Sequence, residues 1–162
     1  MAKETMGSLN ARGKTFCLVA SRYGRLVTDR LVAGARECIA QHGGRAEDVD
    51  VVWVPGAFEI PLAAKVCAQS GRYDAVIALG CVTRGETTHN EYIAAEVAKG
   101  LAHVNMATEV PAVLGVLTVD TLEQGLERAG MKGGGRGYEA ASVAIEMADL
   151  MAAVRPKVKR RR

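Results

Sequence analysis

The sequence is poor in aromatic residues, has no long apolar run and has no closely spaced cysteines. Aromatic side chains make up 4% of its 162 residues, which leaves little stacking surface for a single-stranded nucleic acid. Its longest apolar stretch, Ala75 to Val82, is much shorter than the ~20 residues of a membrane-spanning helix. We therefore expect no membrane contact. The cysteines form no CxxC pair, the pattern of a zinc site or a redox motif, so we also expect no metal and a reducing cytoplasmic location. The cysteines are Cys17, Cys38, Cys67 and Cys81.

The rest of the composition is that of a folded domain. With 49% hydrophobic and 24% charged residues, the chain is too apolar to stay disordered and long enough for one domain with its own core. The net charge of +3 comes from a cluster of basic residues near the C-terminus, and the remainder of the chain is mildly acidic. The first residues contain no apolar segment like that of a secretory signal. We therefore divide the chain into a flexible segment 1–14, a domain 15–154 and a solvated basic tail 155–162.

Short apolar runs alternate along the chain with longer segments of helical periodicity. The run at residues 75–81 is apolar at nearly every position, which is typical of a central strand buried on both faces. This alternation predicts a parallel sheet covered by helices on both faces, in a three-layer αβα sandwich of flavodoxin-like type with four strands. The expected strands are residues 16–20, 49–54, 75–81 and 113–119.

The helices are indicated by apolar residues that recur every three or four positions. Thr88 to Glu91 has the pattern of a capping box, in which Thr88 caps a helix and His89 is its first residue. The segment Asp120 to Glu123 offers an N-terminal cap for a short helix that ends at Gly130, and the last helix is expected from Tyr138 to Val154. The other apolar stripes are Val27, Leu31, Ala35 and Ile39; Ile60, Ala64, Cys67 and Ala68; and Ile93, Val97, Leu101 and Val104.

In a sheet of this kind, ligands bind at the carboxyl ends of the strands. Residues 80–89 place a glycine, hydroxyl groups and His89 between the third strand and its helix, where unpaired N–H groups and the helix dipole favour an anion such as phosphate. The same dipole disfavours the imidazolium form, so we expect a neutral His89 that can accept or donate a proton. An ordinary capped helix with a solvated histidine is the alternative interpretation.

Two further features could contribute to a binding site. Residues 54–59 form a turn after the second strand, in which Phe58 could stack on a flat ring and backbone groups could bind a polyol. Phe58 could equally belong to the core, and Glu59 could be a favourable charge at a helix start. Arg128 precedes a glycine-rich loop and could hold a phosphate through a bidentate contact, although most surface arginines have no such role.

Several common patterns of functional sites do not fit this sequence. The glycines of residues 133–137 follow no strand, so they form neither a dinucleotide fingerprint nor a Walker loop. Ser21 and Ser142 lack the sequence of a nucleophile elbow, which disfavours a hydrolase. The basic tail could bind RNA, but because no nucleic-acid motif accompanies it we expect no nucleic-acid partner.

Three long motifs follow one another between about residues 16 and 152. They are VPGAFEIP at residues 54–61, ALGCVTRGETTH at 78–89, and GVLT at 115–118 with ERAG at 127–130. With these motifs the chain resembles the lumazine synthase family. The resemblance implies the condensation of 5-amino-6-ribitylaminouracil with 3,4-dihydroxy-2-butanone 4-phosphate to 6,7-dimethyl-8-ribityllumazine, phosphate and water. This is the penultimate step of riboflavin biosynthesis, and the resemblance implies neither a metal nor a cofactor.

The resemblance also implies a role for each matching residue. His89 would transfer protons, and Tyr23 would stack on the pyrimidine ring. The phosphate would be held by Gly85, by Glu86 through its backbone N–H, and by Thr87, Arg128 and Arg136. The residues expected to contact the ribityl chain are Ala57, Phe58 and Glu59, and those expected to line the pyrimidine pocket are Val82, Thr83 and Leu114.

Two positions depart from the family pattern. Leu114 stands where the family often has phenylalanine, which thins one wall of the pocket, and Arg136 stands where the family has lysine. In this family the site lies between neighbouring subunits of a pentamer, and some members assemble pentamers into an icosahedral shell, so we expect a homo-oligomer. The two departures leave open a second hypothesis, a binding module that stores a flavin-like ligand without turnover.

Overall fold

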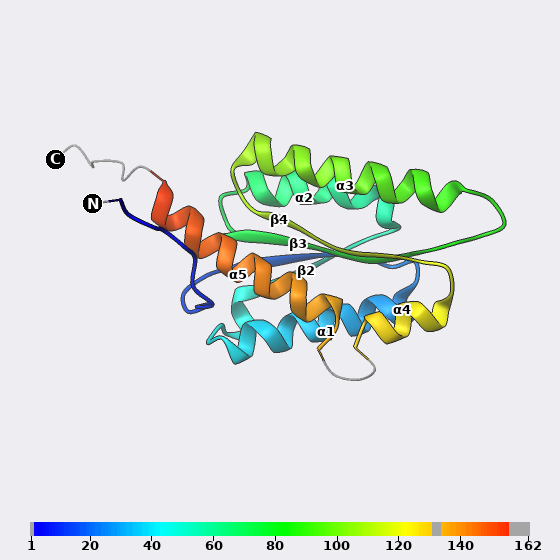
Figure 1. The fold of residues 1–162 in the computed structure, drawn as a ribbon, viewed down its shortest axis with the longest axis horizontal. Helices are drawn as coiled ribbons and strands as arrows, with labels where there is room; N and C mark the ends of the chain where they lie inside the picture. Colours follow the sequence, from blue (N-terminus) through cyan, green and yellow to red (C-terminus); the bar gives the residue numbers. More distant parts are fainter. Residues whose placement is uncertain (1, 131–133, 156–162) are drawn as a thin grey trace.

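A four-stranded parallel sheet lies between two layers of helices (Figure 1). This computed structural model describes residues 2–130 and 134–155. The strands are β1 (Phe16–Ser21), β2 (Val49–Val54), β3 (Ala75–Thr83) and β4 (Ala112–Val119), in the spatial order β2-β1-β3-β4. The helices are α1 (Arg25–Gln41), α2 (Ile60–Gln69), α3 (His89–Thr108), α4 (Leu122–Arg128) and α5 (Arg136–Val154), with short 3-10 turns η1 (Ala46–Asp48) and η2 (Ala57–Glu59). The predicted flavodoxin-like sandwich is therefore confirmed.

The central strand β3 pairs with both β1 and β4. Its residues from Ala75 to Val82 are all buried, because helices cover the sheet on both sides. A strand covered on both faces needs apolar side chains in both directions, which explains the continuous apolar run in the sequence. The carboxyl ends of β1, β2 and β3 consequently meet at one edge of the sheet, where the loops that follow them lie side by side.

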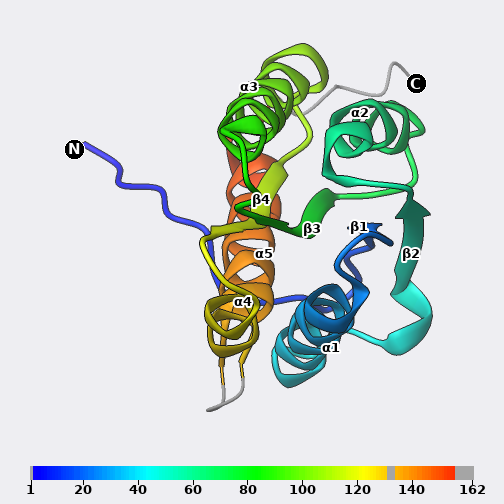
Figure 2. The same cartoon turned by 90° about the vertical axis from the view of Figure 1, so that its right-hand side faces the viewer.

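The sheet separates two apolar cores. Along β1, Phe16, Leu18 and Ala20 point towards the layer of α1, α4 and α5, while Cys17 and Val19 point towards α2 and α3. This alternation follows from the two-residue period of a strand. Figure 2 shows the two layers on opposite sides of the sheet. No helix within residues 2–130 and 134–155 combines the length and the apolarity needed to cross a membrane.

Helices α1 and α5 approach each other closely at the start of α5. A Cβ atom added to Gly137 would lie 2.1 Å from the carbonyl oxygen of Leu31, so only glycine fits at this contact. The buried face of α5 continues with the small residues Ala140, Ala141 and Ala144. Small side chains let the helix axis lie near the sheet and near α1, which fixes the position of Arg136 at the first turn.

The predicted element boundaries are mostly right, with differences at helix starts. The cap predicted within Asp120 to Glu123 is confirmed and is Thr121, whose Oγ1 accepts a hydrogen bond from the Gln124 N–H at 3.2 Å. Thr88 is the N-cap of α3 and His89 its first residue, as predicted, but the predicted capping box is wrong, because the Thr88 side chain makes no capping hydrogen bond. Instead, the Thr87 hydroxyl accepts from the His89 N–H at 3.4 Å. Helix α5 starts at Arg136, two residues before the predicted start at Tyr138.

Part of the predicted flexible segment 1–14 is attached to α5. The Asp149 carboxylate accepts hydrogen bonds from the Ser8 N–H and the Ser8 hydroxyl, both at 2.8 Å, and from Lys14 Nζ at 3.0 Å. Ala11 is fully buried, and its N–H donates to the His42 carbonyl oxygen at 3.0 Å. Most of the predicted basic tail, residues 156–162, lies outside the described residues. The domain limits therefore stay predictions.

We expect Asp149→Ala to lower the stability of the fold in a pH-dependent way. The Ser8 N–H first, and then Lys14, lower the pKa of Asp149 from 3.8 to about 2. A carboxyl with a lowered pKa stabilises the folded state above its unfolded pKa and loses this effect as the pH falls through its folded pKa. Chemical denaturation should therefore show a loss of about 1 kcal/mol at pH 7, reduced for solvent screening, that disappears between about pH 4 and 2.

Asp29→Ala is the matched control for this measurement. Asp29 forms an exposed i,i+4 ion pair with Arg25 at 3.2 Å, so its removal should change the free energy of unfolding by less than about 0.5 kcal/mol. Equal losses in the two variants would contradict a specific role of Asp149.

Candidate active site

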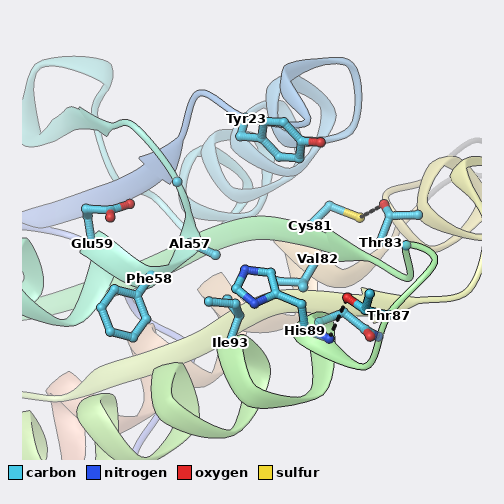
Figure 3. Close-up of a pocket in the computed structure, with 13 residues that line it drawn as sticks. Tyr23, Ala57, Phe58, Glu59, Cys81, Val82, Thr83, Thr87, His89 and Ile93 are labelled. Atoms are coloured by element: carbon cyan, nitrogen blue, oxygen red, sulfur yellow. Dashed lines mark hydrogen bonds between the residues drawn. The ribbon is translucent and has the colours of Figure 1, made fainter.

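A pocket of about 440 Å³ opens where the carboxyl ends of β1, β2 and β3 meet the start of α3 (Figure 3). This is the position at which a doubly wound sheet binds its ligands. The walls combine apolar side chains with hydroxyl groups, a carboxylate and an imidazole. The lining residues are Tyr23, Gly56, Ala57, Phe58, Glu59, Cys81, Val82, Thr83, Gly85, Thr87, His89, Asn90 and Ile93.

The turns after β1 and β2 are joined by their backbones. The Arg22 N–H donates to the Val54 carbonyl oxygen at 2.8 Å, and the Tyr23 N–H donates to the Pro55 carbonyl oxygen at 3.0 Å. These two bonds continue the ladder between the strands beyond their last paired residues, Ser21 and Val54. They set the exposed Tyr23 ring on the same side of the pocket as the turn that contains Ala57 and Phe58.

The loop between β3 and α3 forms the open side of the pocket. Gly85 and Thr87 are both exposed, and a Cβ atom added to Gly85 would meet no atom within 4 Å. A ligand could therefore approach this backbone closely. Because α3 is 20 residues long and begins directly after the loop, its first N–H groups provide the positive end of a long helix dipole at this point.

His89 is the first residue of α3 and points into the pocket. Its imidazole lies between the turn that contains Ala57 and the helix residue Ile93 (Figure 3). Within residues 2–130 and 134–155, no side chain or backbone group hydrogen-bonds to the ring, so both ring nitrogens are available to a ligand. A positioned imidazole beside an anion site can move a proton to or from a bound substrate.

The pocket contains little positive charge of its own. Among its described lining residues none is lysine or arginine, and Glu59 contributes a carboxylate. A bound anion would therefore depend on the N–H groups of residues 85–87 and on cations from elsewhere. Glu86 does not line the pocket, and its side chain is exposed.

The two predicted phosphate-binding arginines lie together in a second hollow of about 520 Å³ beside the edge strand β4. Arg128 is the last residue of α4, and Arg136 is the first residue of α5. One Arg136 nitrogen donates to the Leu114 carbonyl oxygen at 3.1 Å, and another lies 3.4 Å from Glu139. The backbone bond to β4 holds the Arg136 guanidinium against the edge of the sheet.

Leu114 lies in a third hollow, between the edge strand β4, α5 and the end of α3. Its side chain points away from the core and is 37% exposed. One chain therefore brings together the predicted residues of the turns and the β3–α3 loop, but it does not bring Leu114, Arg128 or Arg136 to the same pocket. The predicted residues that do share the pocket are Tyr23, Ala57, Phe58, Glu59, Val82, Thr83, Gly85, Thr87 and His89.

The sequence analysis missed Asn90 and Ile93 among the residues that line the pocket, and it gave no individual role to Gly56 and Cys81, which lie within the predicted segments 54–59 and 80–89. Ile93 had been assigned to the apolar stripe of its helix, and it lies one turn after His89 on the same face. Cys81 is buried, and burial raises the pKa of its thiol, so it stays protonated and is no nucleophile. Asn90 had a sequence signal only as a polar residue in the first turn of a helix.

The described part of the chain contains no cluster of side chains that could bind a metal ion. No group of three or more histidine, cysteine, aspartate or glutamate side chains converges there. The pocket brings together the backbone N–H groups of a helix start, a histidine, exposed aromatic rings and apolar side chains. These groups suit a flat polar ring with an anionic partner, joined by steps that need proton transfer and close positioning.

The chain was compared with models of known protein families. The family model described as 6,7-dimethyl-8-ribityllumazine synthase matches residues 13–152. The match includes all five helices that the structure describes, apart from the last two residues of α5, and every strand of the sheet. It therefore includes the pocket with His89 and the second hollow with Arg128 and Arg136.

We expect Thr121→Ala to destabilise the protein through α4, the helix that positions Arg128. Loss of the Thr121 capping bond should lower the free energy of unfolding by about 1 kcal/mol in chemical denaturation. Thr88→Ala is the matched control, since Thr88 holds the same position on α3 without a capping bond, and it should change stability by less than about 0.5 kcal/mol. A larger loss for Thr88→Ala than for Thr121→Ala would contradict the capping geometry.

Proposed function

Because the chain belongs to the 6,7-dimethyl-8-ribityllumazine synthase family, whose members are transferases of riboflavin biosynthesis, we propose which reaction it performs and where. It condenses 5-amino-6-ribitylaminouracil with 3,4-dihydroxy-2-butanone 4-phosphate and thereby catalyses the penultimate step of the pathway. The observation that supports this most strongly is the placement of His89 beside the open N–H groups of the β3–α3 loop, inside a pocket with exposed aromatic rings.

The phosphate of the second substrate binds at the start of α3. Gly85, Thr87 and the backbone N–H of Glu86 surround it, and the dipole of the long helix stabilises its negative charge. Glu86 takes part through its backbone alone, because it is not a lining residue of the pocket and a carboxylate would repel the phosphate. This arrangement keeps the leaving group next to the imidazole that must exchange protons with the reacting carbon and nitrogen atoms.

The pyrimidine substrate occupies the rest of the pocket. Tyr23 and Phe58 are 78% and 58% exposed, so both rings are available to stack on a flat heterocycle. Val82 and Thr83 line the base of the pocket beneath the ring. The ribityl chain extends along Ala57 to Glu59, where the N–H and C=O groups of a turn can bind hydroxyl groups.

The chemistry consists of imine formation, phosphate elimination and ring closure. The amine of the pyrimidine attacks the ketone carbon, and water leaves as the imine forms. A proton is then removed from carbon while the phosphate departs with the electron pair of its C–O bond. The enol that remains takes up a proton and becomes a methyl ketone, the second nitrogen attacks its carbonyl carbon, and a second water leaves as the ring closes. His89 accepts and returns the protons of these steps, and the pocket aligns the two substrates.

The active site is completed by a neighbouring subunit in a pentamer. Arg128, Arg136 and Leu114 lie at the edge strand β4, in hollows separate from the pocket of their own chain. If the β4 edge of one copy faces the pocket of the next, the two arginines supply the positive charge that the pocket lacks. A contact between two different faces is heterologous, and repeated copies close into a five-membered ring when each copy is turned by a fifth of a circle relative to the next.

Two exposed apolar surfaces support this head-to-tail contact. On one side, Phe58, Leu62 and Val66 form an exposed stripe along η2 and α2. On the other side, Leu114 and Val143 line an apolar hollow near β4 and α5. Figure 2 shows α2 and β4 at different sides of the molecule. Burial of both surfaces against each other would remove apolar patches from water. A shell built from several pentamers would be a further level of assembly.

The proposal is tested by mixing the two substrates with the protein and following the fluorescence of the product. We expect a rate well above that of the slow uncatalysed reaction, measured at early times. His89→Ala should slow turnover roughly 10- to 100-fold and leave residual activity, because positioning remains. His103→Ala, an exposed histidine on the same helix, should leave the rate unchanged. A tight complex with a flavin-like ligand and no turnover would instead support a binding module.

The shared site is tested by complementation between two impaired chains. Co-expression of His89→Ala with Arg128→Ala chains should restore roughly a quarter of the wild-type sites in a randomly mixed ring, because each site takes one residue from each of two subunits. Mixed rings of His89→Ala and Phe58→Ala chains are the control, since both changes affect the same half of the site. Sedimentation of the mixed assemblies must match the wild type, and activity no higher than the average of the parents would reject the shared site.

A further inference from the structure

Asn90 is a buried polar residue in the wall of the pocket. It follows His89 as the second residue of α3, it lines the pocket, and it is 8% exposed. Its side-chain oxygen Oδ1 is sealed from solvent and has no hydrogen-bond partner among the described residues. The other buried polar side chains do have partners: Ser21 donates to the Tyr23 carbonyl oxygen at 3.1 Å, and Thr28 donates to that of Gly24 at 3.3 Å.

The fold gains nothing from an amide at this position. A buried acceptor that leaves water without finding a donor lowers the stability of the folded state, so such groups are rare unless they have a function. Asn105, on the same helix, shows the usual arrangement. Its amide donates to the carbonyl oxygens of Leu101 and Ala112 at 3.0 and 2.9 Å, and its oxygen accepts from the Ala112 N–H at 2.7 Å. An apolar side chain of similar size would serve the packing around Asn90 better.

The surroundings of Asn90 indicate which kind of group could pair with it. Val82 and Ile93 are the mostly buried apolar residues of the same pocket, whereas Gly85 and Thr87 of the anion site are exposed. An amide oxygen is an acceptor, so an ionised phosphate, which offers only acceptors, cannot satisfy it. The missing partner is an N–H or O–H group on a neutral part of a ligand.

We propose that Asn90 is a substrate-binding residue whose Oδ1 accepts a hydrogen bond from an N–H or O–H group of the pyrimidine substrate. This inference rests on the proposed function, which supplies the substrate. A small rotation of the side chain brings the amide to the ligand, since the terminal torsion of asparagine is soft. The pocket thus distinguishes a hydrogen-bonding heterocycle from an apolar ring of the same shape, because the latter leaves the amide unpaired.

The test uses the full-length assembled protein and the variant Asn90→Leu. Binding of 5-amino-6-ribitylaminouracil alone, measured by calorimetric titration, should weaken roughly tenfold, and its KM should rise by the same factor. The KM for the butanone phosphate and kcat should stay within about twofold, because the anion site and His89 are unchanged. The melting temperature without ligand should stay the same or rise. Asn90→Ala, which adds no bulk, should reproduce the loss of affinity.

Asn105→Leu is the matched control for stability. It makes the same substitution on the same helix but removes three hydrogen bonds, so its melting temperature should fall where that of Asn90→Leu does not. Unchanged affinity for the pyrimidine in both Asn90 variants would overturn the proposal. A smaller assembly of either Asn90 variant in sedimentation would also overturn it, because it would indicate that Asn90 contacts a neighbouring subunit. Absence of turnover in the wild type would reject the proposed function alone, because the titration needs no turnover.

Discussion

The burial of β3 on both faces is the constraint on which the rest of the structure depends. Ala75 to Val82 are all buried, so helices must cover both sides of the sheet, and each strand must return through a helical crossover. Parallel strands joined in this way all end at the same edge. That edge collects the turn after β1, the turn after β2 and the loop before α3, which are far apart in sequence and together form the pocket.

The edge strand β4 carries the second group of predicted site residues. Its inner pairing with β3 is complete, while Leu114 points outward and the Leu114 carbonyl oxygen receives the Arg136 guanidinium. Arg128 and Arg136 lie on α4 and α5, which belong to the helix layer on the other side of the sheet from α3. A single chain therefore holds the two arginines apart from His89. A chain with acid–base and stacking groups on one side and cations on another suits assembly from identical copies better than work as a monomer.

Most of the fold could be predicted from the sequence, because strand periodicity and helix periodicity differ strongly here. The strand limits were right to within two residues, and the cap predicted within residues 120–123 is present at Thr121. Thr88 is the N-cap as predicted, but its hydroxyl makes no capping bond, and the Thr87 hydroxyl accepts from the first N–H of α3, a side-chain choice that spacing alone does not determine. The nine lining residues were found because turns after parallel strands converge. Asn90 was missed because its distinguishing property, an unpaired buried oxygen, exists only in three dimensions.

The backbone bonds from Arg22 to Val54 and from Tyr23 to Pro55 have a consequence for how the pocket accommodates different molecules. They hold the backbones of the two loops together, whereas the exposed Tyr23 side chain keeps its own rotamers. Little backbone entropy is then lost when a heterocycle enters, which favours affinity. Bulkier ring systems can be admitted by rotation of the Tyr23 side chain but not by separation of the two loops, because that would break the hydrogen bonds that extend the ladder of the sheet.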